Sequence, residues 1–200
     1  MDTEKEHDRT IALKELETVS RASAGSAAVK LEELLIHPYQ IVRISAAELL
    51  GQFEERGSVT LLASALNDRC EYVAAAAAEA LANIGTPQAL QALRCSFLED
   101  QVVRPHYLSN AIARFGKEGF DILVRCTSSE SATLRYYAAR GLGSTGAEEA
   151  LPILERLAGN DVERTSFGGL VATAAKQGIK ILKRMNARDN RKTLDRKLEK

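Results

Sequence analysis

Catalytic and metal sites are most often built from histidine and cysteine, and this 200-residue chain has three of each. None of the histidines has a carboxylate or a thiol at the spacing that a set of metal ligands requires; they are His7, His37 and His106. The cysteines form no Cys-x-x-Cys pair and their number is odd, so they indicate neither a disulfide framework nor a zinc site; they are Cys70, Cys95 and Cys126. The sequence therefore predicts no metal, no cofactor and reduced thiols.

Phosphate binding and acyl transfer leave short motifs of their own. The run from Gly141 to Gly146 has the spacing Gly-x-Gly-x-x-Gly, but it ends a helical pattern instead of joining a strand to a helix. Its first two glycines, Gly141 and Gly143, are better explained by close packing between helices. No serine lies in a nucleophile elbow, so no catalytic triad can be assigned. We therefore do not expect an enzyme.

The remaining candidate residues depend on the elements that hold them, and the composition favours helices. Apolar residues make up 45% of the chain, aromatic residues make up only 5%, and tryptophan is absent. Alanine and leucine carry much of the apolar content, which favours close-packed helices over sheets. The sequence predicts an all-α protein.

Helical patterns and breaks divide the chain into short helices. The most regular pair is a helix over 71–84, a turn at Gly85 and a helix over 87–98. The expected helices cover 3–21, 27–36, 40–53, 59–66, 71–84, 87–98, 102–115, 118–127, 132–145, 148–158, 162–174 and 177–185. The last two meet at Ala175, and the helices from residue 40 onward form five helical hairpins.

The repetition is visible column by column when Leu81 is the anchor. Its equivalents are branched apolar residues about 30 residues apart, namely Leu50, Ile112, Leu142 and Val171. The following column is always small, and its members are Gly51, Ala82, Ala113, Gly143 and Ala172. A large apolar residue beside a small one lets neighbouring helices approach closely. The turn glycines, which we expect at positive φ, are Gly85, Gly116 and Gly146.

Two further patterns support the repeat. Residues 117–125 align without gaps on residues 176–184, which indicates that 177–185 is the second helix of the last hairpin. Acidic and polar residues stand between the hairpins, where they can cap the free N–H groups of the next helix. These residues are Asn67-Asp68, Glu99-Asp100, Ser129-Glu130 and Asn160-Asp161.

A helix-turn-helix repeated about every 30 residues is typical of an α-solenoid. Residues 73–90 resemble HEAT repeats of the short, phycobilisome-lyase-like kind. That family begins its alanine-rich helices with Val-Arg, which occurs here as Val42-Arg43, Val103-Arg104 and Leu134-Arg135, with Glu163-Arg164 as a degenerate copy and Val73-Ala74 as the exception. The resemblance implies a right-handed α-solenoid of about five to six antiparallel helical hairpins.

We expect three segments, an N-terminal capping helix at 1–25, the HEAT-like solenoid at 26–186 and a basic C-terminal tail at 187–200. The net charge is zero, yet residues 1–100 hold 9 Lys and Arg against 16 Asp and Glu, and residues 101–200 hold 18 against 11. Such a charge dipole can steer a partner. There is no apolar run of the roughly 20 residues that cross a bilayer, and the charged start does not resemble a signal peptide, so we expect a cytoplasmic protein.

In this family the Val-Arg helices line the concave side, so the resemblance implies a binding groove on their outward residues. The outward columns are Glu48, Glu79, Asn110, Arg140 and Gly169; Gln52, Asn83, Arg114, Ser144 and Thr173; and Ile44, Ala75, His106, Tyr136 and Thr165. The groove changes from acidic to basic along the chain, whereas helical phase places Tyr107 and Tyr137 in the core. The residues that we expect to contact a partner are Glu48, Glu79, His106, Asn110, Arg114, Tyr136 and Arg140.

These patterns favour a non-enzymatic scaffold that binds a protein or a peptide in the groove. The resemblance leaves open a bilin lyase-like or chaperone subunit, although the His-Glu pairs of HEAT-type di-iron hydroxylases are absent. A HEAT-like nucleic-acid-binding protein such as a DNA-repair glycosylase is a further alternative, against which the missing tryptophan and the acidic first half count. The basic residues of 183–200 would supply phosphate contacts, but Asp189, Asp195 and Glu199 interrupt them.

Overall fold

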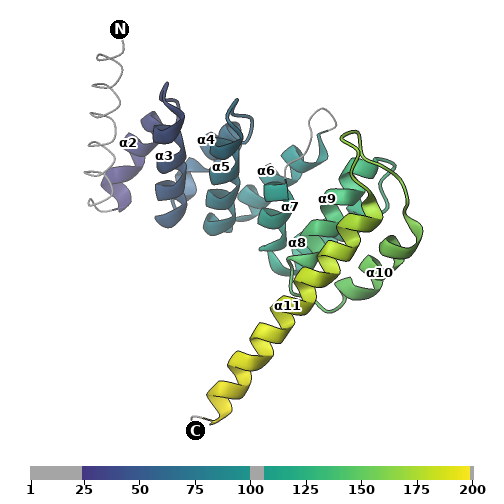
Figure 1. Cartoon of the computed structure of the whole chain (residues 1–200). Helices are drawn as coiled ribbons and strands as arrows, with labels where there is room; N and C mark the ends of the chain where they lie inside the picture. The colour runs from purple at the N-terminus through teal and green to yellow at the C-terminus, as the bar shows by residue number, and fades with distance from the viewer. Residues whose placement is uncertain (1–23, 100–105, 199–200) are drawn as a thin grey trace. The chain divides into compact units, whose positions relative to one another are not determined.

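Helices make up the regular structure of this chain. The computed structural model describes residues 24–99 and 106–198, with side chains over 28–99 and 106–188 (Figure 1). Within these ranges every regular element is a helix, apart from one isolated β-bridge between Arg164 and Leu170. The prediction of an all-α fold is confirmed, while the helix predicted at 3–21 lies outside the described residues. In the ranges described, no helix has both the length and the apolar character needed to pass through a lipid bilayer.

The chain divides into two compact units, Met1–Ser96 (unit 1) and Phe97–Lys200 (unit 2). The helices of unit 1 are α2 (Ala24–Leu34), α3 (Gln40–Gln52), the 3-10 helix η1 (Arg56–Ser58), α4 (Val59–Ala65), α5 (Glu71–Ile84) and α6 (Pro87–Leu98), which crosses the boundary near its end. The helices of unit 2 are α7 (His106–Ala113), α8 (Gly116–Cys126), α9 (Ala132–Gly143), α10 (Ala150–Asn160) and α11 (Val171–Leu198). The segment boundaries predicted at 25 and 186 stay a prediction, and α11 runs through the second of them without a break.

The core of unit 1 is made by small and branched side chains because α3 and α5 pack closely side by side. Fully buried residues of these two helices are Val42, Ala46, Ala47, Leu50, Val73, Ala77, Ala78 and Leu81. A Cβ atom on Gly51 would lie 2.6 Å from the Cα atom of Ala80, so a larger residue could not be accommodated without a backbone shift. The close contact between α3 and α5 explains why the column of small residues in the sequence has glycine at position 51.

Three hairpin turns use glycine in the left-handed region, as the sequence predicts. Gly85, Gly116 and Gly146 have φ values of 62°, 54° and 72°. Gly85 ends α5 and donates its N–H to the carbonyl oxygen of Leu81. The turn after α3 differs, because there a non-glycine residue, Glu54, has a φ of 52°.

In unit 2, α9 is the central helix. It packs against α7 and α11, and also against α8 and α10 (Figure 1). The fully buried side chains at these contacts include Ile112, Leu123, Leu142, Leu154 and Leu182, with Ala138, Ala139 and Val171 filling the narrower spaces. Each helix thus buries one apolar stripe against α9 or its neighbours and leaves the opposite side to solvent.

The last predicted hairpin is wrong. A helix was expected over 162–174 with a second helix over 177–185, but residues 161–170 form a loop and α11 then runs unbroken from Val171 to Leu198. The pair Gly168-Gly169 explains the loop, because Gly168 has a φ of 87° and the N–H of Gly169 bonds to the hydroxyl of Thr165. Ala175 does not interrupt the helix, since alanine is the strongest helix former.

The position of α11 also corrects the alignment of 117–125 on 176–184. α8 is the second helix of a hairpin, whereas α11 packs against both α9 and α10, as the first helix of a further repeat would. The closest approach of α9 to α11 is at Gly143 and Gly178, where a Cβ on Gly143 would overlap the backbone of Gly178. The explanation of Gly143 as a packing glycine is confirmed. Its partner is Gly178, which was not in the columns of repeated residues aligned from the sequence.

Candidate functional site

The arginine that begins α3 is part of the core of unit 1 and is not a groove residue. Arg43 is 5% exposed. Its Nε and Nη2 atoms donate to the two carboxylate oxygens of Asp68, each at 2.8 Å. Its Nη1 atom donates to the carbonyl oxygens of His37 at 2.7 Å and Pro38 at 3.1 Å. One side chain therefore ties the connection before α3 to the connection before α5.

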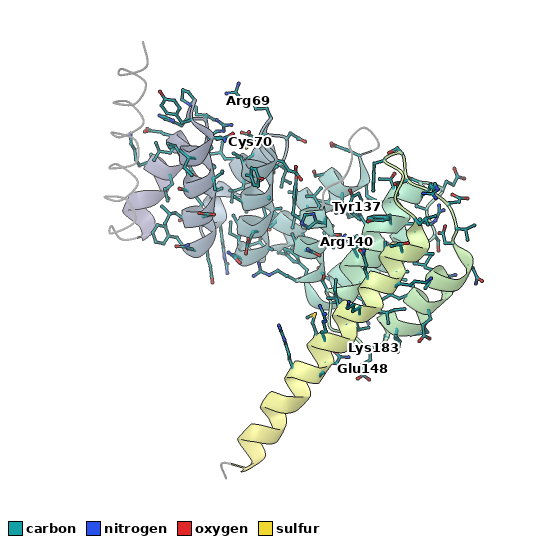
Figure 2. The ribbon with its side chains drawn as sticks, viewed as in Figure 1. Arg69, Cys70, Tyr137, Arg140, Glu148 and Lys183 are labelled. Carbon is teal, nitrogen blue, oxygen red and sulfur yellow. The ribbon has the colours of Figure 1, made fainter. Side chains whose placement is uncertain are left out.

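The pairing holds both groups in their charged forms. The hydrogen bonds from Arg43 lower the pKa of Asp68, and the backbone N–H of Cys70 adds to the effect by donating to Oδ1 at 2.8 Å. The same contact with Asp68 raises the pKa of Arg43. Two planar groups joined by parallel hydrogen bonds give a geometrically specific contact. Figure 2 labels Arg69 and Cys70, which follow Asp68 in this connection.

Unit 2 repeats this arrangement with the same atoms. Arg135 on α9 donates from Nε to Oδ2 of Asp161 at 2.6 Å and from Nη2 to Oδ1 at 3.2 Å. Its Nη1 atom donates to the carbonyl oxygens of Ser129 at 2.7 Å and Glu130 at 2.9 Å. Glu163 adds a third partner, with Oε2 at 2.7 Å from Nη2. We call each arrangement an arginine clamp, Arg43 with Asp68 in unit 1 and Arg135 with Asp161 in unit 2.

The clamps were not predicted from the sequence, although both partners were singled out separately. Asp68 and Asp161 were expected to cap the N–H groups of the next helix, but each accepts only the backbone N–H two residues later, from Cys70 before α5 and from Glu163 in the loop. Their main partner is instead an arginine 25 or 26 residues earlier. This nearly equal spacing is the signal that could have revealed the pairs. Because each clamp binds backbone carbonyls and a carboxylate inside its own unit, we interpret both as contacts that stabilise the fold.

Two of the predicted groove residues belong to unit 1. Glu48 on α3 and Glu79 on α5 are both exposed. The other exposed charged residue of these two helices is Glu71, so every exposed charge on α3 and α5 is negative. The open face of α3 and α5 is therefore acidic and suited to a partner that presents positive charge.

The other five predicted groove residues belong to unit 2, and their surroundings differ. His106 at the start of α7 and Arg114 directly after its end are exposed, and Asn110 between them is half-buried. Asn110 accepts a hydrogen bond of 3.0 Å from the hydroxyl of Ser144 after α9. Arg140 on α9 is half-buried, and its Nη1 atom donates to Oε1 of Gln177 on α11 at 3.3 Å. Polar side chains thus link α9 to both neighbouring helices.

An aromatic cluster extends this face, and one member was missed from the sequence. The ring of Tyr136 lies with its centroid 5.2 Å from Tyr137 and 5.3 Å from Phe167, both edge to face. Tyr137 is buried, as its helical phase predicts, whereas Phe167 is 42% exposed. Phe167 stands in the loop 161–170 that was expected to be helical, which is why no helical pattern indicated it.

The outward column is wrong at its last member. Gly169 was expected beside Arg140, but it lies in the loop, where a Cβ would approach the ring of Tyr136. Gln177 takes the place beside Arg140 because the loop delays the start of α11. Since Glu48 and Glu79 belong to unit 1 and the other candidates to unit 2, the predicted groove residues form two separate candidate surfaces. No group of three or more His, Cys, Asp or Glu able to hold a metal occurs in the part of the chain that the structure describes.

Similar solved structures include helical repeat proteins. An engineered protein from the Northeast Structural Genomics Consortium is 20% identical, with a TM-score of 0.43, 87% of this chain covered and 89% of the other. A designed armadillo repeat protein in complex with the peptide (KR)4 is 19% identical, with a TM-score of 0.42 and coverages of 87% and 92%. Human deoxyhypusine hydroxylase in complex with glycerol is 16% identical, with a TM-score of 0.32 and coverages of 88% and 87%. These likenesses carry no information about function.

Two family models match different parts of the chain. The model for HEAT repeats matches residues 28–105, and the model for the PBS lyase HEAT-like repeat matches residues 134–160. No curated protein matches the chain. The first match covers the hairpins of unit 1, and the second covers most of α9 and all of α10, including Arg135 but not its partner Asp161. The two matches support a HEAT-repeat protein of the phycobilisome-lyase-like kind.

Proposed function

We propose that this chain is a non-enzymatic scaffold that binds a protein or peptide segment on the open face of α7, α9 and α11 in unit 2. The observation that carries the proposal is the contrast between two arginines of α9. Arg135 is buried and fully used by its clamp, whereas Arg140 lies on the open side and is held by one side chain, Gln177. Arginine on an open helix face is among the residue types that dominate binding energy.

The polar side chains of this face are ordered before any partner arrives. Gln177 restrains the guanidinium of Arg140, and Ser144 restrains the amide of Asn110. Restraint of this kind lowers the entropy lost on binding, because fewer side-chain rotations have to be frozen. A partner would then contact groups that already point outward, with Arg140 pairing to a carboxylate.

Apolar contact area is present beside these polar groups. Tyr136 is half-buried and packs edge to face on Phe167, whose ring is 42% exposed. Aromatic rings packed against one another lose little freedom on binding and give a large contact surface. Figure 2 shows Tyr137 and Arg140 on α9, one helical turn apart, with the buried tyrosine supporting the ring of Tyr136. Tyr136, Phe167 and Arg140 are the expected anchors.

Unit 1 offers a second surface of opposite charge. Glu48 and Glu79 lie on the packed pair α3 and α5, and Tyr72 at the start of α5 is 74% exposed. A segment with lysine or arginine beside an apolar residue would complement this face. In the proposed function the two units therefore select segments of opposite charge.

Selection of peptides from a random display library by the purified full chain tests the proposal. Arg140→Glu with Arg114→Glu should abolish enrichment of acidic peptides, because both changes place negative charge on the proposed face. The matched control is Lys117→Glu with Arg125→Glu, two exposed cations of α8, which should leave the enrichment unchanged.

The folded state is checked by thermal melting of each variant followed by circular dichroism. If the double variant melts early, Arg140→Gln alone removes the charge with less disturbance and should still reduce the enrichment. Equal enrichment of acidic peptides by the parent chain and by Arg140→Gln would contradict the assignment of this face.

A further inference from the structure

The exposed side of α11 carries a row of positive charges. The residues of this row, which we call the basic stripe, are Lys176, Lys180, Lys183, Arg184 and Arg188, and all five are exposed. No aspartate or glutamate occurs between Val171 and Arg188. At about 100° per residue, the five positions fall within roughly 140° of the helix circumference. They therefore form one continuous face.

The opposite face of the same helix holds it in place. Ala174, Ala175, Gly178 and Leu182 are buried, and α11 packs through them against α9 and α10. Beyond these contacts the helix continues past the other helices of its unit (Figure 1). Because packing fixes the buried face, the basic stripe is directed to solvent.

No ion pair joins any of the five cations of the basic stripe to a carboxylate in the described part of the chain; the four ion pairs found there involve Lys30, Arg43 and Arg135. Lys183 is labelled on α11 in Figure 2. Five cations held on one face of a rigid helix create a positive potential that attracts an extended anion.

Because α11 is one continuous helix, its basic segment begins before residue 183. Taken as a tail over 183–200, the segment mixes cations with Asp189, Asp195 and Glu199. Because α11 starts at Val171, Lys176 and Lys180 join the same face, and all five cations precede the first acidic residue. The acidic residues that argued against phosphate contacts therefore come after the last residue of the basic stripe.

The chemistry of the stripe fits phosphates better than an acidic protein surface. Three of its five residues are lysines, which are depleted at protein interfaces, and its exposed neighbours Gln177 and Ala187 offer no large apolar anchor. Residues four apart on a helix are separated by about 6 Å along its axis, so the stripe presents cations at short, regular intervals to an anionic polymer. Contacts to phosphate need charge and hydrogen-bond donors only.

We propose that the basic stripe of α11 binds the phosphate backbone of double-stranded nucleic acid, without preference for base sequence. The five cations lie on the exposed side of α11, opposite the face that packs against α9 and α10, so phosphates can approach them from solvent. The nucleic-acid contact then comes from α11, and the peptide surface comes from the face around α9.

Fluorescence anisotropy of the full chain with two labelled 20-base-pair duplexes of unrelated sequence tests this inference. Both duplexes should bind equally, and five phosphate contacts should weaken binding by about 10²–10³-fold between 50 and 200 mM salt. Lys180→Gln with Lys183→Gln should make the dependence of log K on log salt less steep by about 2. The control, Lys117→Gln with Arg125→Gln on α8, should leave that dependence close to that of the parent chain.

Three results would overturn the inference. They are no binding at 50 mM salt, an equal loss of binding in the control variant, and tighter binding of a glutamate-rich peptide than of the duplex, which would identify an acidic protein segment as the partner. Circular dichroism of the Lys180 and Lys183 variant excludes unfolding as the cause of a loss. The inference does not depend on the proposed function, because Arg140→Gln should leave duplex binding intact while it reduces peptide enrichment.

Discussion

The two arginine clamps use the same atoms in different sequence surroundings. In unit 1 the carbonyl oxygens come from His37 and Pro38, and in unit 2 they come from Ser129 and Glu130. The clamp therefore depends on backbone carbonyls, one carboxylate and their spacing, and not on the neighbouring side chains. The clamps differ in one respect, since Arg135 has Glu163 as a third partner and Arg43 has no counterpart to it.

The repeat that follows the first clamp, α5 with α6, has no clamp arginine. Ala74 on α5 stands where Arg43 stands on α3, and it is buried at 2% exposure. α5 has nine buried residues of its fourteen, more than any other helix for which buried residues are given. Close alanine packing and a clamp are thus two ways of fixing a repeat against its neighbour, and the following changes separate their contributions.

The largest effect is expected from Arg135→Ala. It leaves the Asp161 carboxylate and the carbonyl oxygens of Ser129 and Glu130 without their donor in a poorly hydrated place, and removal of one partner from a buried pair costs about 3–5 kcal/mol of unfolding free energy. Chemical denaturation should show this loss, and hydrogen exchange read by mass spectrometry should place it in unit 2. Arg43→Ala should place a similar loss in unit 1.

A paired replacement sharpens this prediction. Arg135→Met with Asp161→Leu removes both charges, so it should cost less than Arg135→Ala alone, because no unpaired buried charge remains. If the two variants are equally unstable, the stabilisation by the clamp comes from the hydrogen bonds to the carbonyl oxygens and not from the ion pair.

The glycines at the closest helix approaches should give the next largest effects. Gly143→Ala places a Cβ into the backbone of Gly178, and Gly51→Ala places one 2.6 Å from the Cα of Ala80. Each should cost about 1–3 kcal/mol through forced separation of helices. The matched control is Gly159→Ala on α10, where the added Cβ meets nothing within 4 Å and should stabilise the chain by about 0.5–1 kcal/mol. A control as unstable as the other two would contradict the packing explanation.

Acid should weaken both clamps. The pKa values of Asp68 and Asp161 are lowered from the usual 3.8, mainly by hydrogen bonds from their arginines. A carboxyl group with a lowered pKa in the folded state stabilises fully above its unfolded pKa, and this contribution disappears as the pH falls through the folded pKa. The unfolding free energy measured in urea from pH 6 to pH 2 should therefore fall steeply below about pH 4. The double variant Asp68→Asn, Asp161→Asn should have a lower and flatter profile.

The smallest effect is expected from Glu163→Gln, which removes the only partner that distinguishes the two clamps. The Glu163 side chain is 66% exposed, so its ion pair with Arg135 is screened by water and is worth about 0–1 kcal/mol. A loss much above this range would show that the third partner is essential to the second clamp.

The sequence predicted the helices of the regular repeats closely, because their signals are local. The predicted bounds of 71–84 and 87–98 agree with α5 and α6, and the glycines at 85, 116 and 146 have the expected positive φ. Alanine-rich helices separated by glycine turns need no long-range information to be recognised. The exposure of Glu48, Glu79 and Arg114 likewise follows from helical phase alone.

The features that the sequence did not predict depend on contacts between distant residues. The clamp joins Arg43 to a carboxylate 25 residues later, which helical periodicity does not encode. The loop 161–170 replaced a predicted helix because Gly168-Gly169 and the hydroxyl of Thr165 favour a turn over a helical pattern that was already weak. With the start of α11 delayed, Phe167 joined Tyr136 and Gln177 replaced Gly169 beside Arg140.

The separation of the clamp partners by about one repeat has a consequence for how such a chain can change in evolution. Duplication of a whole hairpin copies the arginine and the aspartate together, so each new copy brings its own clamp. Insertion of a single residue into the helix that carries the arginine would rotate it by about 100° and separate the partners. The clamp thus favours growth by whole repeats, while the separations of 25 and 26 residues show that the chain between the partners tolerates a difference of one residue. The loop after Asp161 lies beyond the second clamp, and it is there that this chain departs from the repeat.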